Sequence, residues 1–105
     1  MNRIFKEYRT WALITGAASG MGREYARRLA LVGYNLVLVD INAKGLGETE
    51  SIVKDAVNTA GKASEAFKVL QVVQDLSQVD AADKVYGQTE AAGCEVEVLV
   101  NNAGI

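Results

Sequence analysis

Four short apolar runs alternate with three longer amphipathic patterns along this 105-residue chain, and this alternation restricts the fold more than any other feature. The runs lie at residues 11–14, 36–39, 69–73 and 96–100, and their length predicts β-strands. The first two are continuously apolar, as expected for strands that are covered on both faces of a parallel sheet. The last two contain polar residues, so we expect them nearer an edge or exposed on one side.

The three intervals between these runs carry helical patterns. Each has apolar residues three or four positions apart, followed by a glycine of the kind that commonly ends a helix. The order β-α-β-α-β-α-β predicts an α/β fold, with a parallel sheet whose connecting helices lie on its faces. The stripes are Met21, Tyr25, Leu29 and Val32 before Gly33; Ile52, Val53, Ala56, Val57 and Ala60 before Gly61; and Ala82, Val85, Tyr86 and Thr89 before Gly93.

Composition excludes several classes of function. The formal net charge is −2 and the basic residues are scattered, which argues against a nucleic-acid partner. We interpret the tightest basic group, Arg23, Arg27 and Arg28, as the solvated face of the first helix. The chain has no His and a single Cys, Cys94, so His chemistry, an internal disulfide and a structural zinc site are excluded. No apolar stretch approaches the ~18 residues of a membrane span and residues 1–9 do not resemble a signal peptide, so we expect a cytoplasmic protein without a membrane partner.

A glycine-rich loop, Thr15-Gly16-Ala17-Ala18-Ser19-Gly20-Met21-Gly22, follows the first apolar run and leads into the first helix. Gly16 permits a sharp turn, Gly20 removes a side chain where the backbone would approach a phosphate, and Gly22 permits close packing. The N–H groups and positive dipole of the helix would then face a pyrophosphate. A purely structural turn is the alternative, but the preceding strand and following helix favour phosphate binding.

Asp40 ends the second apolar run, 20 residues after Gly20. An acidic residue at roughly this spacing can accept hydrogen bonds from the ribose hydroxyls of an adenosine and would repel a 2′-phosphate. Neither Ile41 nor Ser19 supplies a positive charge, so the sequence favours NAD over NADP. The alternative is that Asp40 is only a turn or helix-capping residue.

The pattern T-G-x-x-x-G-x-G resembles the short-chain dehydrogenase/reductase family. Asp75-Leu76 after the third run and Asn101-Asn102-Ala103-Gly104 after the fourth resemble two further family motifs, the latter being N-N-A-G. The resemblance implies a Rossmann-type, doubly wound sheet of strand order 3-2-1-4, with residues 1–105 as one dinucleotide-binding unit. It implies that Asn101 braces the sheet, that Asp75 and Leu76 pack around the adenine, and that the cofactor is bound by Gly16, Ser19, Gly20, Met21, Gly22, Asp40, Ile41, Asp75, Leu76, Asn102, Ala103 and Gly104.

The resemblance also implies hydride transfer between a secondary alcohol and a ketone, catalysed by a Ser and a Y-x-x-x-K pair. None of the tyrosines begins that pattern, so no catalytic residue is assigned, and we expect a chain truncated before its catalytic half and inactive alone. Residues 11–15 with Tyr25 resemble the hydroxysteroid and 3-ketoacyl reductase branch. We expect a homo-oligomer acting on a small-molecule alcohol or ketone. A non-catalytic dinucleotide-binding or regulatory module and a fragment without its own function are the alternatives.

Overall fold

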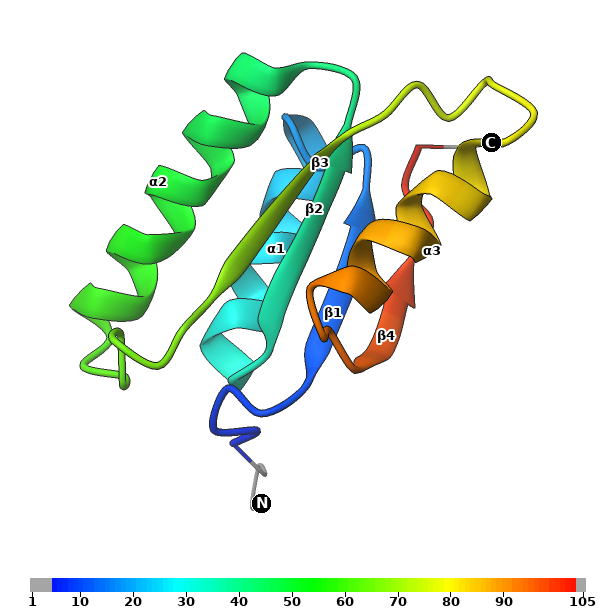
Figure 1. The fold of residues 1–105 in the computed structure, drawn as a ribbon. Helices are drawn as coiled ribbons and strands as arrows, with labels where there is room; N and C mark the ends of the chain where they lie inside the picture. The colour runs from blue at the N-terminus through cyan, green and yellow to red at the C-terminus, as the bar shows by residue number, and fades with distance from the viewer. Residues whose placement is uncertain (1–4, 104–105) are drawn as a thin grey trace.

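Four parallel strands form the centre of the fold in the computed structural model, which describes residues 5–103. The strands are β1 (Trp11–Thr15), β2 (Asn35–Asp40), β3 (Val69–Val73) and β4 (Val96–Val100). They lie side by side in the order β3-β2-β1-β4 (Figure 1), which confirms the expected topology. All four strands coincide with the apolar runs to within one residue at each end.

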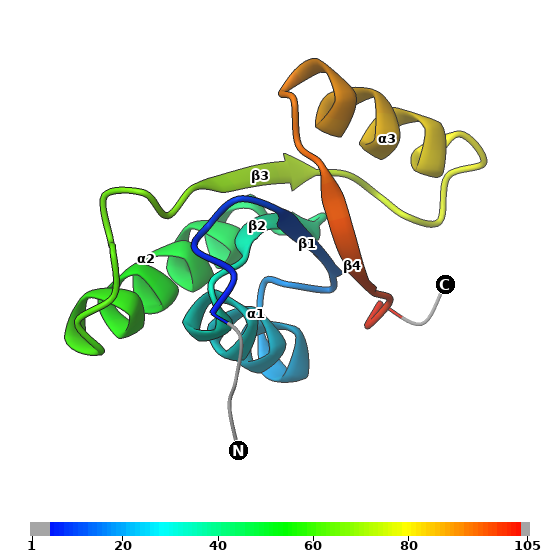
Figure 2. The ribbon, with the colours of Figure 1, turned by 90° about the horizontal axis from the view of Figure 1, so that it is seen from below.

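Three helices cover both faces of this sheet. Helices α1 (Gly20–Val32) and α2 (Ala43–Thr59) lie on one face, and α3 (Ala81–Ala91) lies on the other, as Figure 2 shows. The sheet therefore has a hydrophobic core on each side, as a doubly wound α/β fold requires. Within residues 5–103, no helix combines the length and apolar character needed to cross a membrane.

The two central strands, β1 and β2, supply most of the sheet's contribution to these cores. Ile14, Leu36 and Leu38 are fully buried beneath α1 and α2, whereas Val37 and Val39 are buried on the α3 side. Strands β3 and β4 are more exposed, in agreement with their polar residues. The distinction between central and outer strands was therefore readable from the continuity of each apolar run.

The apolar stripe expected for α1 is wrong for Met21, Tyr25 and Val32, which are exposed, whereas Leu29 packs against the core as expected. Its buried residues are Gly22, Ala26 and Ala30, whereas Met21 is 65% exposed and Tyr25 also reaches solvent. The buried residues are four positions apart and small, so the helix axis lies close to the sheet and the larger apolar side chains fall beside the contact. Size of the side chain, rather than hydrophobicity, identifies the buried face of this helix.

The other two helices depart less from expectation. In α2, Val53 and Val57 are buried as predicted, but Ile52 is exposed. In α3, Val85 is buried as predicted, but Tyr86 is exposed. In each helix the buried face is narrower than the apolar stripe.

Candidate dinucleotide-binding site

The carboxyl ends of the strands meet at one edge of the sheet, where the glycine-rich loop leaves β1. Gly16 has φ +64° and Gly20 has φ +57°, a region that favours glycine. A Cβ on Gly22 would lie 2.0 Å from the carbonyl oxygen of Gly16, so only glycine lets the first turn of α1 lie against the loop. The structural reasons given for Gly16 and Gly22 are confirmed, whereas contact of the loop with a phosphate stays a prediction.

The N-terminus of α1 presents backbone N–H groups without a side-chain cap. Ser19 is the N-cap residue, and its side chain makes no capping hydrogen bond. The N–H of Arg23 donates to the Ser19 carbonyl at 3.3 Å, while Gly20, Met21 and Gly22 occupy the first turn, where helical N–H groups have no intrahelical acceptor. Ser19, Gly20 and Met21 are exposed, so this end of the helix is open to an anion.

The Asp40 carboxylate lies at the end of β2 and contacts the same loop. Its Oδ2 accepts a hydrogen bond from the Ala18 N–H at 3.1 Å, and its Oδ1 accepts one from the Asn42 N–H at 3.0 Å. The interpretation of Asp40 as a turn residue is therefore confirmed. Each carboxylate oxygen can accept a second bond, so a ribose contact is compatible with this role. Ile41 beside it is 64% exposed.

Asp75 and Leu76 follow β3 at the same edge. The Gln74 N–H donates to the Asp40 carbonyl at 3.1 Å, which holds the end of β3 beside the end of β2. Asp75 Oδ1 accepts bonds from the hydroxyl and the N–H of Ser77, and these bonds hold the pKa of the Asp75 carboxyl below its usual value. Leu76 is half-buried against the core on the α3 side.

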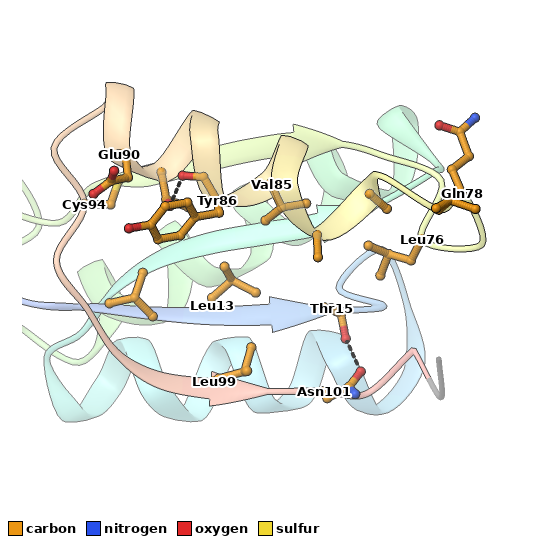
Figure 3. Close-up of a pocket in the computed structure, with 15 residues that line it drawn as sticks. Leu13, Thr15, Leu76, Gln78, Val85, Tyr86, Glu90, Cys94, Leu99 and Asn101 are labelled. Carbon is orange, nitrogen blue, oxygen red and sulfur yellow. Dashed lines mark hydrogen bonds between the residues drawn. The ribbon is translucent and has the colours of Figure 1, made fainter.

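Thr15 is a site residue that the sequence analysis did not single out. Its Oγ1 accepts hydrogen bonds from the N–H groups of Asn102 at 2.9 Å and Ala103 at 3.1 Å. Its proton is within reach of Asn101 Oδ1 at 3.2 Å, a contact drawn in Figure 3. Asn102 Nδ2 also donates to the Gly16 carbonyl at 3.4 Å. One hydroxyl thus joins the residues after β1 to those after β4.

Gly104, the last of the predicted site residues, lies outside the described residues. The threonine that begins T-G-x-x-x-G-x-G was the available signal for the role of Thr15, because it directly precedes the turn at Gly16.

Arg23 is the second functional residue whose role the sequence did not reveal. Its Nε donates to Thr49 Oγ1 at 2.9 Å, and its guanidinium donates to the Ala18 carbonyl at 2.5 Å. Its assignment to a solvated helix face is therefore wrong. The Thr49 hydroxyl in turn donates to the Ala17 carbonyl at 2.7 Å, so α2 is bonded to the glycine-rich loop.

The other two arginines of that group do lie on the outer face of α1. Arg27 and Arg28 both bond to Glu24, at 2.7 Å and 2.8 Å. These hydrogen bonds lower the pKa of the Glu24 carboxyl to about 2. The hydrogen bonds of this cluster join residues of α1 to one another.

A pocket of about 710 Å³ lies between α3 and the face formed by β1 and β4 (Figure 3). Its walls are mainly apolar, with Leu13, Val85 and Leu99 among them, and Thr15 and Asn101 lie at one end. Cys94 lies at the other end, where burial raises the pKa of its thiol and so disfavours the nucleophilic thiolate. The pocket runs beneath α3, and its lining includes Thr15 and Leu76 but neither Asp40 nor any residue from Gly16 to Gly22.

Together, the parallel sheet, the glycine-rich loop at the start of α1 and the acidic residue after β2 define a Rossmann-type dinucleotide-binding domain. The profile of the family described as short chain dehydrogenase matches residues 10–105. The chain belongs to this family, so the resemblance carried by the three motifs is confirmed.

Curated relatives include very-long-chain 3-oxoacyl-CoA reductases. The one from Neurospora crassa is 34% identical over 95 residues, covering 90% of this chain and 26% of the relative. The one from Homo sapiens is 34% identical over 97 residues, covering 90% of this chain and 27% of the relative. The chain thus spans about a quarter of the length of these relatives, and their names agree with the expected 3-ketoacyl reductase branch.

Solved structures share the fold. L-sorbose reductase from Gluconobacter frateurii, complexed with NADPH and L-sorbose, has a TM-score of 0.79 at 27% identity, covering 97% of this chain and 36% of that one. A metagenomic short-chain oxidoreductase in complex with NADP has a TM-score of 0.70 at 33% identity, covering 91% of this chain and 39% of that one. The family therefore supports binding of a nicotinamide dinucleotide of either type.

Proposed function

We propose that the protein is an NAD-dependent oxidoreductase that interconverts a secondary alcohol and a ketone by hydride transfer. In this proposal the described residues bind the adenosine and pyrophosphate of the cofactor, whose nicotinamide supplies or accepts the hydride. Family membership supports the reaction class, and the geometry of the loop supports the cofactor. No residue among 5–103 is assigned to the proton-transfer step.

The observation that carries the proposal is the open N-terminus of α1. A Cβ built on Gly20 meets no atom within 4 Å, so there is free space directly outside the loop. The uncapped N–H groups of the first turn adjoin this space, and the helix dipole adds a partial positive charge there. A pyrophosphate fits this combination of space, donors and charge.

The preference for NAD rests on the residues after β2. The Asp40 carboxylate would accept hydrogen bonds from ribose hydroxyls and repel a 2′-phosphate. The exposed side chain of Ile41 offers that phosphate no charge, and Ser19 offers only a hydroxyl. The solved relatives that contain NADP or NADPH make the comparison between the two cofactors the decisive one.

The test is calorimetric titration of the purified protein with NADH and NADPH. We expect NADH to bind more than about tenfold more tightly, or about 1.4 kcal/mol, and Asp40→Arg to narrow or reverse this difference. Asp55→Arg, an identical charge reversal at an exposed position of α2, is the matched control and leaves the preference unchanged. Equal affinities in the unmodified protein would refute the NAD assignment.

For the substrate, we propose a 3-oxoacyl thioester. The support is the named activity of the relatives from Neurospora crassa and Homo sapiens, which are identical to this chain at about a third of the aligned positions. Oxidation of NADH with acetoacetyl-CoA, compared with a simple cyclic ketone, tests this class in a protein that carries the Y-x-x-x-K pair in addition to this chain, because residues 1–105 are expected to be inactive alone. Preference for the cyclic ketone would contradict it.

A further inference from the structure

In the glycine-rich loop, the backbone N–H and the backbone carbonyl of both Ala17 and Ala18 form hydrogen bonds. The Ala17 N–H donates to the Val39 carbonyl at 3.2 Å, and the Ala18 N–H donates to Asp40 Oδ2 at 3.1 Å. Both acceptors belong to the end of β2. The two carbonyls face the opposite way, toward the first half of α2.

Thr49 binds the first of these carbonyls from within the core. Its side chain is 0% exposed in a helix whose neighbouring buried positions, Leu46 and Val53, are apolar. Its hydroxyl donates to the Ala17 carbonyl at 2.7 Å and accepts from Arg23 Nε at 2.9 Å. Because Arg23 can only donate, the single proton of Thr49 is directed at the loop.

Arg23 binds the second carbonyl. Its guanidinium donates to the Ala18 carbonyl at 2.5 Å and reaches the Gly45 carbonyl at 3.4 Å, and it pairs with Glu48 at 3.5 Å. One side chain therefore bonds to Thr49, to the loop and to the start of α2. Rotation of the Ala18 carbonyl would break its hydrogen bond with the Arg23 guanidinium.

We propose that Thr49 and Arg23 are positioning residues for the dinucleotide. They hold the carbonyls of Ala17 and Ala18 toward α2, so that no carbonyl dipole opposes the pyrophosphate and the N–H groups of the first turn of α1 face it. Binding then needs no reorganisation of the loop, and this preorganisation raises affinity without a direct contact. The inference rests on the proposed function, because it requires that the loop binds the dinucleotide.

Thr49 is tested by an isosteric and a conservative substitution in the purified protein. We expect Thr49→Val, which removes the hydroxyl and keeps the shape, to raise the Kd for NADH by about tenfold, because it leaves a loop carbonyl without its donor. Thr49→Ser retains the hydroxyl and should stay within about twofold of the unmodified protein. Thermal unfolding, followed in parallel, measures the effect on stability separately.

Arg23→Met provides an independent test at a partly exposed position that need not destabilise the core. We expect the same increase of roughly tenfold in the Kd for NADH. The double variant with Thr49→Val should raise this Kd by much less than the product of the two single increases, because both residues belong to one hydrogen-bonded chain. Arg28→Met, which removes an exposed arginine of the same helix that bonds to Glu24, is the matched control and leaves the Kd unchanged.

Ligands that differ in phosphate separate positioning from stability. ADP-ribose carries the pyrophosphate, so its affinity for the variants should fall in parallel with that of NADH. Adenosine lacks the pyrophosphate and should bind the variants and the unmodified protein equally, which ligand-observed NMR can measure. Unchanged Kd values for NADH in Arg23→Met and in folded Thr49→Val would overturn the positioning role and leave the proposed function standing. An equal loss of affinity for adenosine would have the same consequence. Failure of the unmodified protein to bind NADH or ADP-ribose would instead overturn the proposed function, and the inference with it.

Discussion

At the scale of single residues, Thr15 joins two segments that are more than 80 positions apart. Its hydroxyl accepts the N–H groups of Asn102 and Ala103, and Thr15 itself is buried. We expect Thr15→Val to lower the free energy of unfolding by about 1–3 kcal/mol, because it leaves two partly buried N–H donors without their acceptor. Thr15→Ser should recover most of this loss. Chemical denaturation measures both, and equal stability of the Val variant and the unmodified protein would contradict the assigned role.

The residues that sequence reasoning found and those that it missed differ in a physical way. Gly16, Gly22 and Asp40 impose local requirements, namely a positive φ, a close approach and a carboxylate at a strand end, and these requirements are visible in a motif. Arg23 and Thr49 are 26 positions apart in sequence and lie on two different helices that contact each other. Within its own helix, neither residue departs from what is common in helices. Only the packing of α1 against α2 brings them together.

At the scale of elements, the start of α2 carries two glycines for different reasons. A Cβ on Gly45 would lie 2.6 Å from the Cβ of Ala18 and 2.8 Å from its carbonyl oxygen, whereas a Cβ on Gly47 would meet no atom within 4 Å. The Asn42 side chain caps this helix by accepting from the Gly45 N–H at 3.0 Å. Gly45 therefore lets the start of α2 approach Ala18 of the glycine-rich loop, whereas Gly47 makes no such close approach.

These two glycines form a matched pair of tests. Gly47→Ala should stabilise the protein by up to about 1 kcal/mol, because Ala is the better helix former. Gly45→Ala has the same propensity gain but overpacks the loop at a cost of about 1–3 kcal/mol, so its net effect should be destabilising. Gly45→Ala should also weaken NADH binding, which Gly47→Ala should not. Thermal unfolding and titration check both, and a stabilised Gly45→Ala protein with full affinity would contradict the contact.

The elements themselves were predictable to different degrees. Short apolar runs located the strands. Strands β1 and β2 coincide with continuous apolar runs, as expected for strands covered on both faces, whereas β3 and β4 coincide with runs that contain polar residues. Helix faces were less predictable, because Ala26 and Ala30 contribute little hydrophobicity yet set the approach of α1 to the sheet. The strand order 3-2-1-4 was expected only from the family resemblance, since apolar periodicity alone does not specify which strands are neighbours.

At the scale of the whole molecule, β4 pairs with β1 on one side, and no other described strand pairs with its second edge. Leu99 on this strand is 67% exposed, and Glu97 is its only charged residue. An edge of this kind has little protection against pairing with another chain. We expect purified residues 1–105 to self-associate through β4.

Sedimentation of residues 1–105 measures this association. Leu99→Lys should reduce it, because a charge on an edge strand opposes pairing, whereas Val79→Lys, at an exposed residue outside the sheet, should not. A monomer with a sharp, cooperative unfolding transition would show that the edge is tolerated in solution.

We expect a dinucleotide to bind at the corner formed by the glycine-rich loop and the end of β2. The most direct measurement is the change in backbone amide resonances of the isotopically labelled protein on titration with NADH. We predict that the largest changes fall on Gly16 to Gly22 and on Asp40 and Ile41, where the uncapped N–H groups and the carboxylate lie. Changes concentrated instead on the residues of α3 that line the pocket, such as Val85 and Tyr86, or no change at saturating NADH, would contradict this prediction.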